Sequence, residues 1–63
     1  MPRGVATAKQ LAMMARVLNT YCETYRVIDP IQREDTAALI LELFNLGFRE
    51  EEPLRAELIK RLA

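Results

Sequence analysis

The sequence has no histidine, serine or tryptophan, and it has only one cysteine and two glycines. Without histidine and serine, the usual nucleophile–base pairs of hydrolytic enzymes cannot be assembled. Two isolated glycines, Gly4 and Gly47, also fail to make a glycine-rich phosphate-binding loop. We therefore expect a protein that is not an enzyme and that binds no cofactor.

The single cysteine, Cys22, excludes an internal disulfide. One cysteine and no histidine are also too few ligands for the common zinc sites, so we expect no metal site. Cys22 falls between Tyr21 and Tyr25 on the apolar side of a predicted helix, which indicates a buried structural thiol. The alternative, a thiol-dependent enzyme, would require Cys22 to react with thiol reagents in the folded protein.

The small size of the chain limits its own stability. With 63 residues it forms one domain at most, over 1–63. A core of that size supplies about 3–5 kcal/mol, and small domains usually add a disulfide, a metal or a partner. Since the first two are excluded, and since 51% of the residues are hydrophobic, the composition favours oligomerisation.

Long uninterrupted apolar segments are also missing. Arg16 interrupts the apolar stretch from Leu11 to Leu18, and Glu42 interrupts the strongest one, which spans 36–48. A secretory signal needs an unbroken apolar core, and a membrane-spanning helix needs about 20 apolar residues. We expect a cytoplasmic protein without membrane contact.

Charge is balanced overall but unevenly distributed. Nine basic and nine acidic residues give a net charge of zero, which argues against nucleic acid as the main partner. Residues 1–28 carry a net charge of +3 and residues 29–63 a net charge of −3. This complementarity would favour either a folded hairpin or an antiparallel pairing of two chains.

The first of three predicted helices spans about 8–26. Thr7 and Gln10 have the spacing of a capping box at its start. Its residues separate into a polar side and an apolar side. Met13 and Val17 lie at the edge of the apolar side, where they would widen the contact surface. The apolar side itself consists of Leu11, Met14, Ala15, Leu18, Tyr21, Cys22 and Tyr25.

The second helix is predicted over about 30–46 and the third over about 53–62. Asp29 and Pro30 are favoured residues for a helix start, and Gly47 for a helix end. The short connection makes the first two helices an antiparallel hairpin. In the third helix, which Pro53 opens, Glu57 and Arg61 are spaced for an ion pair.

The second helix has more apolar surface than one neighbour covers. Ala37, Ile40, Leu41 and Phe44 form one side and Leu39, Leu43 and Leu46 another, together an arc of about 220° against the usual stripe of about 100°. We expect helix one to cover the first side and a second copy of the chain to cover the other. The predicted fold is therefore all-α, a helical hairpin plus a short third helix, packed as a dimeric bundle.

This reading predicts a non-enzymatic protein–protein interaction or regulatory module that acts as a homo-oligomer, a dimer in its simplest form, with another protein as a further possible partner. The predicted interface consists of Leu39, Leu43, Leu46, Leu54 and Leu58. Helix three could instead cover the second side within its own chain, or exchange between chains.

Two alternatives remain open. A dimer could align Arg3, Lys9, Arg16 and Arg26 from two first helices into a basic stripe that binds nucleic acid. Tyr21 and Tyr25, one turn apart, either form a binding surface or cap the core with hydrated hydroxyls.

Overall fold

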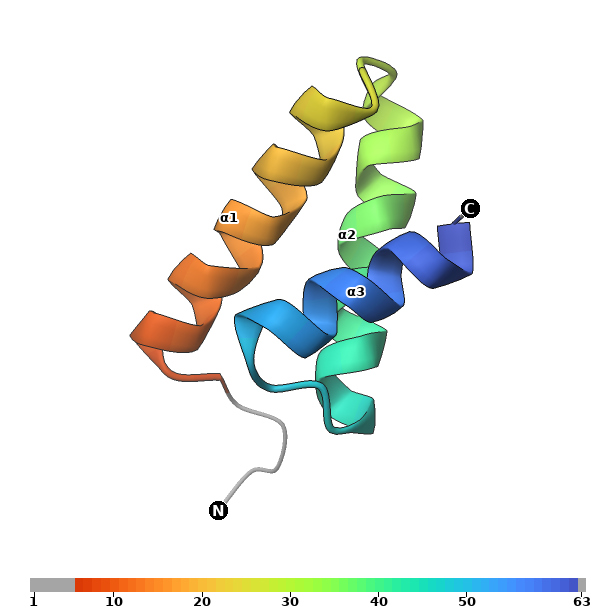
Figure 1. The fold of residues 1–63 in the computed structure, drawn as a ribbon. Helices are drawn as coiled ribbons and strands as arrows, with labels where there is room; N and C mark the ends of the chain where they lie inside the picture. The colour runs from red at the N-terminus through yellow and green to blue at the C-terminus, as the bar shows by residue number, and fades with distance from the viewer. Residues whose placement is uncertain (1–5, 63) are drawn as a thin grey trace.

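A computed structural model describes residues 6–62 as three α-helices. They are α1 (Ala8–Thr24), α2 (Pro30–Leu46) and α3 (Glu51–Leu62). Figure 1 shows that α1 and α2 form an antiparallel hairpin and that α3 lies across one face of it. Every pair of helices is in contact, and residues 6–62 contain no strand. The all-α prediction and the hairpin are confirmed.

Helix α1 starts at the predicted capping box. The Thr7 hydroxyl accepts from the Gln10 backbone N–H at 3.1 Å, and the Gln10 side chain accepts from the Thr7 N–H at 2.9 Å. The helix ends at Thr24, two residues before the predicted end. It ends there because Arg26 adopts a left-handed backbone with φ of 55°, which lets the Val27 N–H return to the Cys22 carbonyl at 2.8 Å.

Helix α2 has the predicted bounds. The Asp29 carboxylate accepts from the Ile31 N–H at 3.0 Å, and Pro30 occupies the first turn. At the other end Gly47 has φ of 120°, and the Phe48 N–H donates to the Leu43 carbonyl at 3.1 Å. Glycine is suited to this position because it lacks the Cβ that disfavours positive φ.

Helix α3 starts at Glu51, two residues before the predicted start at Pro53. Proline is tolerated throughout the first helical turn, where backbone N–H groups have no partner within the helix. The turn therefore closes around Pro53, with the Leu54 N–H bonded to the Glu50 carbonyl at 3.1 Å. The predicted Glu57–Arg61 ion pair is present at 3.0 Å.

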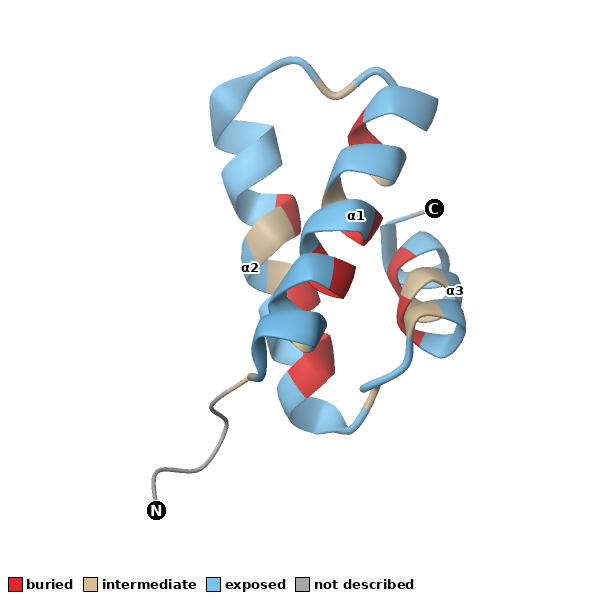
Figure 2. Cartoon of the chain, turned by 90° about the vertical axis from the view of Figure 1, so that its left-hand side faces the viewer, coloured by how far each residue is buried: buried red, intermediate tan, exposed pale blue. Residues whose placement is uncertain are grey.

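All three helices contribute to the core, which Figure 2 shows on their facing sides. Phe44 and Ile40 are among its largest fully buried side chains. Cys22 is also buried and unpaired, as predicted. The main core cluster consists of Met13, Met14, Val17, Ile40, Leu43, Phe44, Leu54 and Leu58. None of the described helices has the length and apolarity needed to cross a membrane.

Candidate functional site: an apolar groove between α1 and α2

The structure places three of the five predicted interface residues in the core of a single chain. Leu43, Leu54 and Leu58 are each 0% exposed, because α3 lies on the side of α2 that was assigned to a second chain. Leu39 is partly buried against the same core, and only Leu46 remains largely exposed, at 61%. On this fold a partner cannot reach Leu43, Leu54 or Leu58, so helix three covers this side within its own chain.

The buried side of α1 also differs from the predicted one. Met13 and Val17, predicted at the edge of the apolar side, are buried, whereas Leu11 and Ala15, which were assigned to that side, are exposed. The physical reason is that α1 contacts both other helices, so its buried arc is turned toward α3. Arg16, on the same flank as Met13, is ion-paired to Glu51 of α3 at 3.0 Å.

This rotation leaves an apolar groove on the outer face of the hairpin. The groove has a volume of about 130 Å³, and no residue of α3 lines it. Leu11 and Leu41, on its two sides, are 54% and 51% exposed. We call this surface the α1–α2 groove; its lining residues are Leu11, Met14, Ala15, Leu18, Ala37, Ile40 and Leu41.

The residue spacing along the α1–α2 groove is that of a helix-packing surface. Leu11, Ala15 and Leu18 follow one another at intervals of four and three residues, the spacing that faces a partner helix in coiled coils. The small side chains of Ala15 and Ala37 lie between the leucines and allow close approach of a partner. One turn toward the hairpin loop, the Arg33 guanidinium donates to the Asn19 side-chain oxygen and ties α1 to α2.

The two helices that line the groove carry opposite net charges. Helix α1 has two basic residues, Lys9 and Arg16, and one acidic residue, Glu23. Helix α2 has one basic residue against three acidic ones, which are Glu34, Asp35 and Glu42. The groove thus separates a helix of net charge +1 from one of net charge −2.

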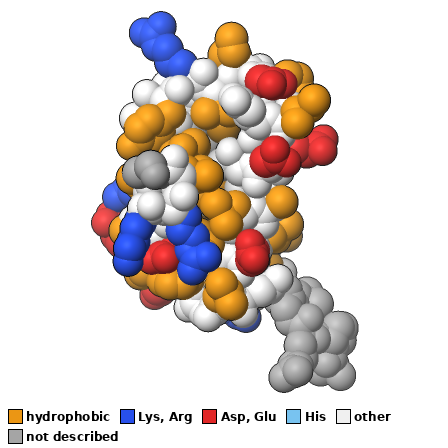
Figure 3. Space-filling view, turned by 90° about the vertical axis from the view of Figure 1, so that its right-hand side faces the viewer, with side chains coloured by type: hydrophobic (Ala, Val, Ile, Leu, Met, Phe, Trp, Pro, Cys, Tyr) orange, Lys and Arg blue, Asp and Glu red, His pale blue; other side chains and the backbone are white. Residues whose placement is uncertain are grey.

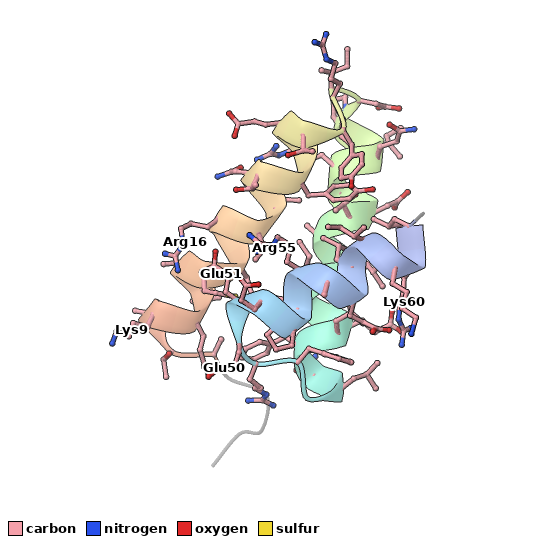
Figure 4. The ribbon with its side chains drawn as sticks, in the orientation of Figure 1. Lys9, Arg16, Glu50, Glu51, Arg55 and Lys60 are labelled. Carbon is pink, nitrogen blue, oxygen red and sulfur yellow. The ribbon has the colours of Figure 1, made fainter. Side chains whose placement is uncertain are left out.

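The residues predicted for nucleic-acid contact do not form a free basic stripe. Arg3 lies outside the described residues. Figure 4 shows Arg16 pointing toward Glu51, and Lys9 lies at the start of the same helix. Lys9 and Arg16 line a shared hollow with Arg49 and with the carboxylates Glu50 and Glu51, which offset two of its three positive charges and weaken any attraction for phosphates. The nucleic-acid alternative stays a prediction without geometric support.

The exposure of Leu11 and Leu41, and the place of half-buried Ala37 in the groove, were not predicted from the sequence. One signal was available: the apolar arc of the first helix, once Met13 and Val17 are included, is too wide for one neighbour. Figure 3 shows hydrophobic side chains at the surface, interspersed with charged ones, on one side of the molecule. The chain therefore does have more apolar surface than it shelters, but at positions other than those predicted.

Comparisons with known proteins do not identify a relative for this chain. Neither a family model, nor a curated protein, nor a solved structure matches it.

Proposed function

We propose that this protein is a non-enzymatic interaction module that acts as a homodimer, with the α1–α2 groove as its interface. The observation that carries the proposal is the exposure of Leu11 and Leu41 on either side of a groove with entirely apolar side chains. Exposure of such a surface to water forgoes hydrophobic stabilisation, and an uncovered patch of leucines promotes aggregation.

A second copy is the occupant that fits the charges. If two hairpins stack face to face about a two-fold axis parallel to their helices, α1 of one copy lies over α2 of the other. The helix of net charge +1 then faces the helix of net charge −2 twice. Arg16 and Asp35 lie on the α3 side of the hairpin, so this attraction acts at long range and is weak. The product is a four-helix arrangement with α3 of each copy on the outside.

The size of the α1–α2 face determines how tightly we expect two copies to bind. Helices α1 and α2 have 17 residues each, which corresponds to a length of about 25 Å at about 1.5 Å per residue. A face two helices wide and this long lies at the lower end of specific interface sizes. We therefore expect a reversible dimer with a dissociation constant on the order of micromolar.

Sedimentation velocity and light scattering over a range of concentrations test the proposal. Leu41→Glu should give a monomer at all concentrations, because it places a charge in the interface, yet retain its helical circular dichroism because Leu41 is exposed. Leu46→Glu is the matched control: Leu46 is also exposed, lies on α2 and does not line the groove.

The control should remain dimeric. A wild-type chain that is monomeric at all accessible concentrations would refute the dimer. A Leu41→Glu variant that dimerises like the wild type would refute the groove as its interface.

A further inference from the structure

A crevice at the hairpin end of the molecule, separate from the α1–α2 groove, has a different chemistry. Because α3 crosses the hairpin instead of running along it (Figure 1), the loop end of α1 and α2 is only partly covered. Two hollows lie there and share Tyr21 and Leu62 as a common wall. We call the pair of hollows the tip crevice.

The first hollow of the tip crevice, of about 320 Å³, provides hydrogen-bond acceptors. It is lined by Tyr21, Val27, Gln32, Asp35, Thr36 and Leu62. The Thr36 hydroxyl donates to the Gln32 carbonyl at 2.9 Å, so its oxygen is left to accept. The exposed Asp35 carboxylate accepts only, and none of the six lining residues is basic.

The second hollow, of about 180 Å³, is aromatic and aliphatic. It is lined by Tyr21 of α1, by Tyr25 directly after α1, and by Ile59 and Leu62 of α3. The two tyrosine rings lie 4.6 Å apart between centroids with an interplanar angle of 36°. The tyrosine rings and the aliphatic wall together favour an apolar or aromatic group in this hollow.

From this combination we propose that the tip crevice binds an organic cation: a primary ammonium or guanidinium group attached to an apolar body. The cationic N–H groups donate to Asp35 and Thr36 in the first hollow. The apolar body lies against the tyrosine pair, Ile59 and Leu62 in the second. Such a group occurs both in free amines and in the lysine and arginine side chains of a protein segment.

The chemistry distinguishes this ligand from its competitors. An anion would meet Asp35 with no basic side chain among the lining residues to compensate it. A neutral apolar molecule would fill the second hollow but leave the acceptors of the first without a donor. A cation with an apolar body fills both hollows and also compensates the charge of Asp35, which a neutral donor does not.

The experiment is a titration of the labelled wild-type protein followed by ¹H–¹⁵N NMR. The probes are phenethylamine, a free aromatic amine, and N-acetyl-leucyl-arginine amide, a model of a protein segment. The uncharged control ligand is 2-phenylethanol. We expect saturable shifts at Tyr21, Asp35 and Leu62 with both cations at millimolar concentration and no saturation with the alcohol. The tighter of the two cations identifies the source of the ligand.

Matched variants test the roles of the side chains. Asp35→Asn keeps the shape of the crevice and should weaken cation binding by about fivefold or more, as expected for the loss of a charge-assisted hydrogen bond. Glu34→Gln removes the adjacent carboxylate, which does not line the crevice, and should bind as the wild type does. Tyr25→Leu, at an exposed position, removes an aromatic contact with the apolar body and should weaken binding by about two- to fivefold.

Three results would overturn the proposal. They are equal binding of the alcohol and the amine, wild-type affinity in Asp35→Asn, and the absence of saturation with both cations. Cation binding can be measured separately from dimerisation by repeating the titration with Leu41→Glu. This variant removes the groove interface and leaves every residue of the tip crevice in place.

Discussion

Arg26 occupies the position after α1 where glycine is the usual residue. Its φ of 55° is left-handed, a conformation that costs a non-glycine residue roughly 1–2 kcal/mol. This backbone conformation is stabilised because it allows the Val27 N–H to bond to the Cys22 carbonyl, which turns the chain toward α2. The end of α1 therefore contains strain at a single residue.

Replacing that residue should stabilise the protein. Arg26→Gly relieves the strain but increases the backbone freedom of the unfolded chain, so the net gain in the free energy of unfolding should be about 0.5–1 kcal/mol. Urea denaturation at a fixed, low protein concentration measures it. Arg26→Ala, which keeps a Cβ, is the control and should give little of this gain. Equal stabilisation by both variants would show that the side chain, not the backbone, is responsible.

The burial of Leu43 changes the effect that we expect from its substitution. It was predicted at an interface, where Leu43→Asp would separate two folded chains. Because Leu43 is 0% exposed, the variant instead buries a charge in the core and removes apolar contacts. The second effect alone costs about 2–5 kcal/mol, comparable to the whole stability of a domain this small.

We therefore expect Leu43→Asp to lose its helical circular dichroism and its cooperative thermal transition. Leu41→Glu, at an exposed position two residues earlier, should keep both. A folded Leu43→Asp monomer with wild-type helicity would show that α3 does not cover this side of α2 in solution.

At the scale of elements, the helix ends were predictable because their signals are local. Thr7 with Gln10, Asp29 with Pro30, and Gly47 each act through the backbone within one turn. The predicted ends erred by two residues where the signal was weaker. At Arg26 no glycine marks the end of α1, and Pro53 fits more than one position in the first turn of α3.

The orientation of each helix about its own axis was harder to predict. It depends on where α3 lies, and no local pattern in α1 or α2 specifies that position. Once α3 covers Leu43, α1 turns Met13 toward it and Leu11 outward. The apolar excess of α2 was therefore predictable from the sequence, whereas the residues that remain exposed were not.

At the scale of the whole molecule, two kinds of two-fold stacking would cover the α1–α2 groove. With the axis parallel to the helices, α1 lies over the partner's α2. With the axis perpendicular to the helices but in the plane of the interface, α1 lies over the partner's α1 and α2 over the partner's α2. Both bury Leu11 and Leu41, so apolar contact alone does not distinguish them.

Electrostatics does distinguish them. In the first arrangement a helix of net charge +1 faces one of net charge −2, and in the second each helix faces its own charge. Salt screens surface charges over about 10 Å at about 0.1 M. Raising the salt concentration should thus weaken the first dimer, which we propose, and strengthen the second.

We expect the dissociation constant from sedimentation to rise about two- to fivefold between roughly 50 mM and 500 mM sodium chloride, because exposed charge pairs contribute less than about 1 kcal/mol. Glu42→Gln, which lowers the negative charge of α2, should reduce this rise. The dissociation constant could instead fall with salt while Leu41→Glu still dissociates the dimer. That result would keep the groove as the interface but show that each helix stacks on its own copy.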